Sequence, residues 1–152
     1  RPILEHEIKK YSDYDYILID GVPRLQDMAV SAIKASNFIL IPVTPSPFDI
    51  WSAADLIDLI KERQKKYTLK AAFVLSKVIP GTKIAQEVLE PLKEYYLPII
   101  KNSITQRIIY PTVTAQGLTV FDFKGNSSAR AALKEINSLT HEIIELLNQR
   151  SE

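Results

Sequence analysis

An aspartate follows directly after an apolar run near the start of the chain. Residues 16–19 read Tyr-Ile-Leu-Ile, and Asp20 and Gly21 come next. Because parallel α/β sheets bind ligands at the carboxyl ends of their strands, a carboxylate there can hold Mg²⁺ or its water shell beside a bound phosphate. The alternative is local, with Asp20 capping the next helix or closing a turn with Gly21. This strand alone leaves both interpretations open.

A proline-rich segment follows the second apolar run. Residues 42–49 read Pro-Val-Thr-Pro-Ser-Pro-Phe-Asp. Each proline fixes φ and removes one N–H donor, so the segment forms a stiff loop. Such a loop suits a preset edge of a binding cleft or a partner surface. Taken by itself, it is equally a rigid connection from a strand to a helix.

The apolar pattern predicts the scaffold that positions these residues. Residues 16–19, 38–43, 71–75 and 97–100 are apolar without alternation, which is typical of parallel strands covered by helices on both faces. Helices are predicted between these strands, and the alternation indicates one α/β domain over residues 1–152 with right-handed crossovers. The predicted helices cover 3–11, a stretch capped by Asp49, residues 82–95 and a last helix from Ser127 or Ser128.

The last helix is expected to be amphipathic. Its apolar face is predicted to contain Leu133, Ile136, Thr140, Ile143 and Leu147. On this assignment three glutamates point outward, namely Glu135, Glu142 and Glu145.

The composition excludes several classes of site. The 152 residues contain no cysteine, so disulfides and thiolate sites are excluded, and the two histidines, His6 and His141, lie far apart without zinc spacing. No apolar run approaches the ~20 residues of a membrane helix. A cytoplasmic protein without membrane contact is therefore expected. The net charge of +1 gives no global sign of nucleic-acid binding, so any DNA contact must come from a local patch.

The motifs together resemble the ParA family of partition ATPases, particularly its short ParF-like members. The resemblance rests first on the Asp20-Gly21 strand end and on the Pro-Val-Thr-Pro-Ser-Pro loop about twenty residues later. Residues 72–77, Ala-Phe-Val-Leu-Ser-Lys, and 104–107, Ile-Thr-Gln-Arg, resemble the family's two base-facing segments. Residues 117–122 and the long last helix resemble its C-terminal end. The resemblance therefore spans residues 14–147.

The resemblance implies roles for particular residues. Asp20 would be the carboxylate near Mg²⁺, and Gly21 the start of the switch that senses the γ-phosphate. The adenine or ribose would be bordered by Ser76, Lys77, Thr105, Gln106 and Arg107. Family members sandwich two ATP molecules between two subunits, and the residues near this dimer face would be Thr44, Pro45, Ser46, Pro47, Phe48 and Asp49.

The resemblance also implies partners. ParA-type proteins bind DNA non-specifically as ATP-bound dimers, and a ParB-like centromere-binding partner stimulates hydrolysis. The basic residues expected to contact DNA phosphates are Lys101, Arg107, Lys124, Arg130 and Lys134. A solvated basic surface is the alternative interpretation of these five residues.

One departure from the family is large. The family depends on a glycine-rich phosphate loop near the N-terminus, whereas this sequence has four glycines, none close to another. The first predicted element is also a helix without a preceding strand. We therefore expect the C-terminal two-thirds of a ParA-type ATPase, lacking the N-terminal βαβ unit and inactive alone. ATP and Mg²⁺ would bind the complete protein.

Two other functions fit the same residues. The first is a naturally short interaction module that keeps the partner-binding or DNA-binding face without hydrolysis. The second is another enzyme of the superfamily, either a MinD-like positioning ATPase or an amidoligase-type synthetase. The acidic residues in the polar face of the last helix argue against MinD, which ends in a basic membrane-targeting helix. No polar substrate-binding loop stands out for a synthetase.

Overall fold

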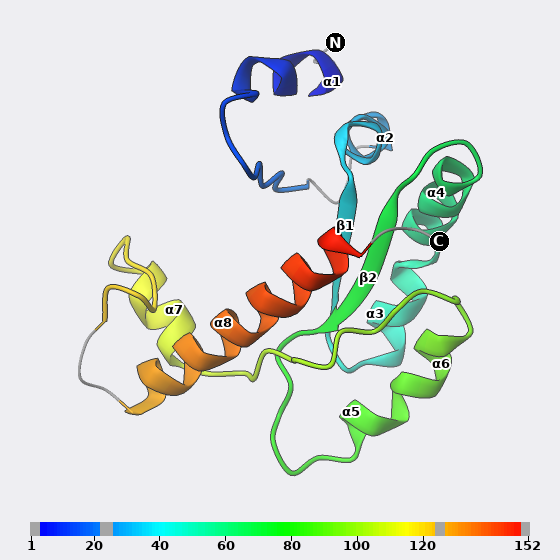
Figure 1. Ribbon diagram of the computed structural model, residues 1–152. Helices are drawn as coiled ribbons and strands as arrows, with labels where there is room; N and C mark the ends of the chain where they lie inside the picture. The colour runs from blue at the N-terminus through cyan, green and yellow to red at the C-terminus, as the bar shows by residue number, and fades with distance from the viewer. Residues whose placement is uncertain (1–3, 22–25, 124–126, 150–152) are drawn as a thin grey trace. The chain divides into compact units, whose positions relative to one another are not determined.

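The computed structural model describes residues 4–21, 26–123 and 127–149 (Figure 1). The chain divides into two compact units. The first comprises Arg1–Ile39 and Ala53–Ala71, and the second comprises Leu40–Ser52 and Ala72–Glu152. Among the described residues, none of the helices combines the length and apolar content needed to cross a lipid bilayer.

A parallel pair of strands confirms the predicted α/β class. The strands are β1 (Phe38–Val43) and β2 (Lys70–Leu75). The amide of Lys70 donates to the carbonyl of Asn37 at 3.0 Å, and the amide of Ser76 donates to the carbonyl of Val43 at 2.9 Å. The constant offset between these pairs means that the strands run in the same direction. The crossover between them contains α3 (Pro47–Ser52) and α4 (Ala54–Gln64).

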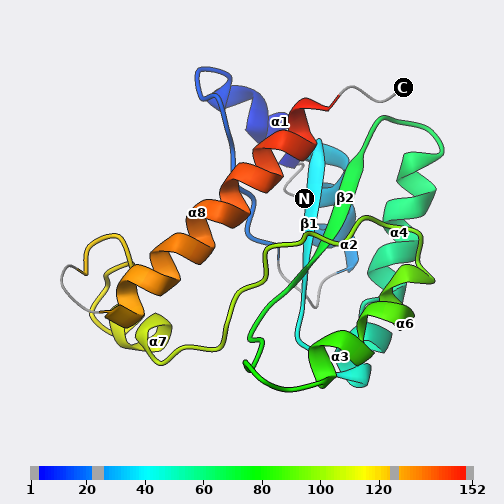
Figure 2. The same cartoon turned by 60° about the horizontal axis from the view of Figure 1, so that its bottom comes forward.

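Further parallel pairing on β2 confirms the apolar run at 97–100. Phe73 forms a parallel bridge with Ile99, and Val78 forms another with Thr105. Phe73 donates to Pro98 and accepts from Ile100, both at 2.8 Å. The chain after α6 (Leu89–Lys93) thus runs along β2 and continues to α7 (Ile109–Thr114) before it returns as α8 (Ser127–Asn148) (Figures 1 and 2).

The first unit is helical around the start of the sheet. It contains α1 (Leu4–Glu7), the 3₁₀ turn η1 (Ile8–Tyr11), α2 (Gln26–Ala35) and α4. The amide of Leu4 donates to Ser31 Oγ at 3.1 Å and so ties α1 to α2. Ile33 on α2 and Ile57 and Ile60 on α4 are buried, with both α4 residues at 0% exposure. The predicted helix at 3–11 is therefore present as two short helical turns.

The strand predicted at residues 16–19 was wrong. Residues 16–20 belong to no helix or strand, and Leu18 is 98% exposed. An apolar run becomes a buried parallel strand only where neighbouring strands pair with its backbone and helices cover its faces. Within the described part of the chain, these residues have no such strand beside them. Their apolar pattern records a tendency to be buried, and the surroundings decide whether that happens.

In the second unit, four described helices follow β2, namely α5 (Ile84–Glu87), α6 (Leu89–Lys93), α7 (Ile109–Thr114) and α8 (Ser127–Asn148). The helix α5 contacts α6, while α7 contacts α8. Val88 separates α5 from α6, so the single helix predicted at 82–95 is two short ones. The helix α7 lies in a region for which no helix was predicted. Its core with α8 consists of Ile109, Val113, Val120, Ala129 and Ala132.

The apolar face predicted for the last helix was only partly right. The fully buried residues of α8 are Ala129, Ala132 and Leu139, whereas Thr140 is exposed. Small alanine side chains allow α8 to approach its neighbours closely, which a pattern weighted toward large residues does not detect. The first turn of the helix after β1 also differs, because α3 begins at Pro47, two residues before the expected cap Asp49. Proline is favoured there because its missing N–H has no partner in a first helical turn.

Candidate functional site

The segment from residue 100 to residue 107 lies between β2 and α8. Six of its backbone amides fall into two groups according to the acceptors of their hydrogen bonds. Those of Ile100, Ile104 and Gln106 donate to carbonyls on or just after β2, at 2.8, 2.9 and 2.8 Å. Val78 returns one hydrogen bond, to the carbonyl of Ile104 at 3.0 Å. This side of the segment is therefore paired as in a parallel sheet.

Three further amides meet two carboxylates on α8. Lys101 and Asn102 donate their N–H groups to Glu142 at 2.8 and 3.0 Å, and Thr105 donates to Glu135 at 3.2 Å. The Asn102 side-chain amide adds a hydrogen bond to Glu142 at 2.6 Å. These carboxylates accept hydrogen bonds that a neighbouring strand would accept elsewhere in a sheet.

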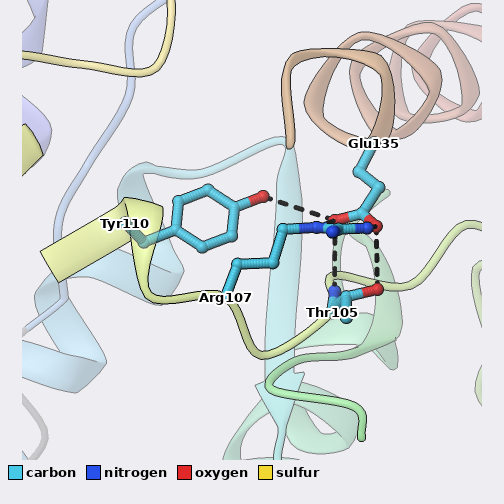
Figure 3. A network of polar contacts seen from close by, with 4 residues as sticks. All are labelled: Thr105, Arg107, Tyr110 and Glu135. Carbon is cyan, nitrogen blue, oxygen red and sulfur yellow. Dashed lines mark hydrogen bonds and ion pairs between the residues drawn. The ribbon is translucent and has the colours of Figure 1, made fainter. Parts of the chain in front are cut away.

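Glu135 is the centre of the densest polar network in this segment (Figure 3). Its carboxylate accepts from Thr105 Oγ1 at 2.7 Å, from Arg107 Nη2 at 2.6 Å and from Arg107 Nε at 3.3 Å. The Tyr110 hydroxyl lies 3.5 Å away. The two guanidinium contacts engage both carboxylate oxygens, which is the fork geometry that favours arginine over lysine. The side chains of Arg107 and Glu135 are 26% and 19% exposed, so the ion pair is largely shielded from water.

The pKa values of this network follow from its contacts. Burial by itself would raise the pKa of Glu135, but the hydrogen bonds from Arg107 and Thr105 outweigh it and lower that pKa. The pKa of Glu142 is lowered in the same way, with the Lys101 and Asn102 amides outweighing burial. The hydrogen bond to Glu135 raises the pKa of Arg107. Burial and then the charge of Glu135 raise the pKa of Tyr110. Both glutamates are therefore held as carboxylates.

The two segments predicted to face a nucleotide base lie side by side in the second unit. Ser76 and Lys77 precede Val78, whose parallel bridge to Thr105 brings them next to residues 104–106. Lys77 has φ of 56°, in the left-handed region that few non-glycine residues adopt. Lys77 and Gln106 are exposed. Arg107 is engaged by Glu135, which leaves Gln106 as the exposed polar side chain of its segment.

The predicted magnesium ligand belongs to the other unit. Asp20 and Gly21 are both exposed, and the residues before them, 16–19, form no strand. Asp20 offers a single carboxylate, which suits Mg²⁺ because this ion takes one or two carboxylates together with phosphate oxygens and water. Within the described ranges, no three His, Asp or Glu side chains come together as a metal-ligand set.

The proline-rich loop ends in exposed aromatic residues. Thr44 and Ser46 are half-buried, Pro45 is buried and Asp49 is exposed. On α3, Phe48 is 76% exposed and Trp51 is 66% exposed. Their ring centroids are 5.6 Å apart at an interplanar angle of 80°, an edge-to-face contact that leaves both rings open to solvent.

The predicted basic residues are only partly gathered. Lys101 is exposed, and so are Arg130 and Lys134, which lie one turn apart on α8. Arg107 is held by Glu135. Lys124 lies outside the described residues.

The prediction that Glu135 and Glu142 point outward was wrong, because both are half-buried and accept hydrogen bonds from residues 101–107. A signal for this was present in the sequence. Each glutamate is three residues after a buried residue of α8, Glu135 after Ala132 and Glu142 after Leu139, so they lie along the buried stripe. Glu145 is exposed, as predicted.

Comparisons with known proteins agree with this architecture. A family model described as an AAA domain matches residues 1–75. The maintenance of carboxysome distribution protein A of Halothiobacillus neapolitanus is 31% identical over 135 residues, covering 87% of this chain and 61% of that protein. A ParA family protein of Mycoplasma genitalium is 23% identical, with 89% and 52% covered. The chain thus spans about half to three fifths of these relatives.

More distant similarities extend the same pattern. The sporulation initiation inhibitor protein Soj of Bacillus subtilis is 24% identical over 98 residues, covering 62% of this chain and 39% of that protein. A solved structure described as a partition protein superposes with a TM-score of 0.64 at 17% identity, over 94% of this chain and 39% of that one. The predicted resemblance and the predicted α/β fold are therefore both confirmed.

Proposed function

We propose that this relative of the ParA family is a segment of a ParA-type ATPase for plasmid or chromosome partition. One observation carries the proposal. Residues 76–77 and 105–107 are some thirty residues apart in sequence, and the bridge between Val78 and Thr105 brings them together. The resemblance to the family assigns both segments to a nucleotide base. Their pairing makes one common base site physically reasonable.

The proposed chemistry is positioning and charge neutralisation. In the complete protein, Asp20 would hold Mg²⁺ near the phosphates of ATP, and Gly21 would begin the loop that responds to the γ-phosphate. Ser76, Lys77 and Gln106 would border the base or ribose. Water would be the nucleophile, and the metal would neutralise the charge that develops on the transferred phosphoryl group.

The proposed partners use surfaces of the second unit. The exposed Phe48 and Trp51 beside the proline-rich loop suit a protein interface, because buried aromatic residues dominate the binding energy of such interfaces. This supports ATP-dependent dimerisation through residues 44–49. Lys101, Arg130 and Lys134 would contact DNA phosphates without reading sequence. A ParB-like partner would stimulate hydrolysis.

The test is ATP binding and hydrolysis by the natural full-length protein, with DNA and its partner present. Asp20→Asn removes the negative charge at nearly constant shape, and we expect hydrolysis to fall by about 10²-fold or more because the metal loses its ligand. Glu145→Gln makes the same kind of change on the exposed face of α8 and should leave the rate unchanged. Failure of the wild-type protein to bind ATP, or an unchanged rate for Asp20→Asn, would contradict the proposal.

The second candidate is an interaction module that binds a partner or DNA without hydrolysis. The exposed aromatic pair on α3 favours it, since exposed aromatic residues suit a protein interface. The intact mass of the natural protein distinguishes the two functions. A natural protein with a mass well above the 17.2 kDa of these 152 residues, and with a phosphate loop in the additional sequence, favours the ATPase. A mass of 17.2 kDa favours the interaction module.

A further inference from the structure

The helix α8 carries two sets of charged residues on neighbouring faces. Glu135 and Glu142 are half-buried and hold residues 101–107, whereas Arg130 and Lys134 are exposed. Lys134 directly precedes Glu135, so the exposed and the half-buried side chains differ in direction by about 100° around one continuous helix. A residue that faces the base site and a residue that faces solvent are therefore neighbours on one element.

The spacing of the two glutamates matches the segment that they hold. Seven residues separate them along α8, which corresponds to about 10 Å of helix. Asn102 and Thr105, whose amides they accept, are three residues apart, and an extended chain covers about 10 Å over three residues. Both carboxylates can thus be satisfied at once only in this alignment. A shift of residues 101–107 along α8 would break both sets of hydrogen bonds.

Glu135 holds the part of the segment that lies beside residues 76–78. It binds Thr105 through the amide and the hydroxyl, and Arg107 through two guanidinium nitrogens. Gln106 lies between these two anchored residues, and its own amide is bonded to Val78. Among the described residues, Glu142 holds Lys101 and Asn102, which lie three to four residues before Thr105, the bridge partner of Val78. Of the two carboxylates, Glu135 is therefore the one that contacts the proposed base-site residues.

We propose that Glu135 is a positioning residue that couples the base-facing segment 105–107 to the basic residues Arg130 and Lys134 on α8. This inference rests on the proposed function. A nucleotide that shifts residues 105–107 must either break the contacts to Glu135 or move α8 with the segment. Ala129 and Ala132 are fully packed in the core, so α8 responds as one body. The presentation of Arg130 and Lys134 to DNA phosphates then depends on the nucleotide.

The experiment measures this coupling as a ratio of affinities. The natural full-length protein is titrated onto a fluorescent random-sequence DNA duplex with Mg²⁺ and either ATP or ADP, at fixed salt concentration. Allosteric couplings commonly change affinity between about 5- and 150-fold. We expect a ratio in this range for the wild type, and a ratio within about twofold of one for Glu135→Gln. A small unfolded fraction lowers both apparent affinities alike, so a merely structural role would leave the ratio unchanged.

Two variants complete the test. Glu145→Gln, an exposed glutamate on the same helix, should keep the wild-type ratio. Thr105→Val removes the hydroxyl that donates to Glu135 at 2.7 Å but keeps the ion pair between Arg107 and Glu135. It should therefore lower the ratio of affinities partly. If Glu135→Gln does not fold, Thr105→Val is the variant that tests the inference. If Glu135→Gln folds and keeps the wild-type ratio of affinities, the inference is overturned while the proposed function stands. If Glu135→Gln does not fold, a wild-type ratio in Thr105→Val has the same consequence. A wild-type protein whose DNA affinity ignores the nucleotide would overturn the proposed function and the inference with it.

Discussion

Replacing Glu135 by glutamine should destabilise the second unit. The substitution keeps the shape of the side chain but removes its charge and converts one acceptor oxygen into an NH₂ donor. The shorter contacts, from Thr105 Oγ1 and Arg107 Nη2, involve Oε1. The amide oxygen should therefore take this position. The new NH₂ group then faces the Thr105 N–H and Arg107 Nε, which previously donated to Oε2 at 3.2 and 3.3 Å.

The magnitude follows from the two hydrogen bonds that lose their acceptor. Each hydrogen bond to a charged group contributes about 1.5–3 kcal/mol when fully buried. The side chains of Arg107 and Glu135 retain 26% and 19% exposure, so water replaces part of each bond and about 1 kcal/mol per bond is reasonable. The free energy of unfolding should thus fall by about 2 kcal/mol. For a chain of this size, that lowers Tm by about 4–8 °C.

Urea and thermal unfolding near pH 7, followed by circular dichroism, measure this change. Glu145→Gln is the matched control and should stay within about 0.5 kcal/mol of the wild type. A double-mutant cycle with Arg107→Ala should give a coupling energy of about 1 kcal/mol or more, because the two side chains contact each other directly. A Glu135→Gln variant as stable as Glu145→Gln would refute the assignment of Glu135 as the anchor of residues 105–107.

Three further predictions concern the same architecture. Glu142→Gln should speed hydrogen exchange at the Lys101 and Asn102 amides by about tenfold, measured by NMR, because their acceptor is weakened; unchanged exchange would mean that water already satisfies them. Since the pKa values of Glu135 and Glu142 are lowered in the folded state, stability should be full above about pH 5 and fall as the pH drops below about 4.3 through those lowered values. The double variant, Glu135→Gln with Glu142→Gln, should flatten this acid loss in pH-dependent urea titrations, and an equally steep loss would assign it to other groups. Leu92→Ala should lower the free energy of unfolding by about 2–5 kcal/mol because Leu92 is 0% exposed. Leu18→Ala should lower it by less than about 0.5 kcal/mol because Leu18 is 98% exposed. Equal losses of stability in thermal unfolding would contradict the burial of Leu92.

The apolar pattern predicted most of the fold, but it also predicted a strand that does not form. The runs at 38–43 and 71–75 correspond to β1 and β2, which pair with each other. The run at 16–19 is also apolar, yet three of its side chains, those of Tyr16, Ile17 and Leu18, are exposed. Strand formation depends on partners distant in sequence, which no local window reports. The short helix α7 was missed for a related reason, since its burial arises from packing on α8.

The sequence predicted which residues form the candidate site, but not the two glutamates of α8 that hold them in place. The resemblance to the ParA family singled out Thr105, Gln106 and Arg107, but a charged residue on a helix is ordinarily assigned to solvent. That rule failed at Glu135 and Glu142, which lie on the buried stripe of α8. A glutamate there is destabilising unless donors reach it.

A segment that pairs with a strand on one side presents donors on the other side. Residues 100–106 donate the amides of Ile100, Ile104 and Gln106 to carbonyls on or just after β2. The same segment presents the amides of Lys101, Asn102 and Thr105 to α8. A buried glutamate needs donors, and an exposed sheet edge needs acceptors, so the two unfavourable features satisfy each other. Two glutamates seven residues apart on a helix that packs along an extended segment are therefore better interpreted as partners of that segment's backbone than as surface charges.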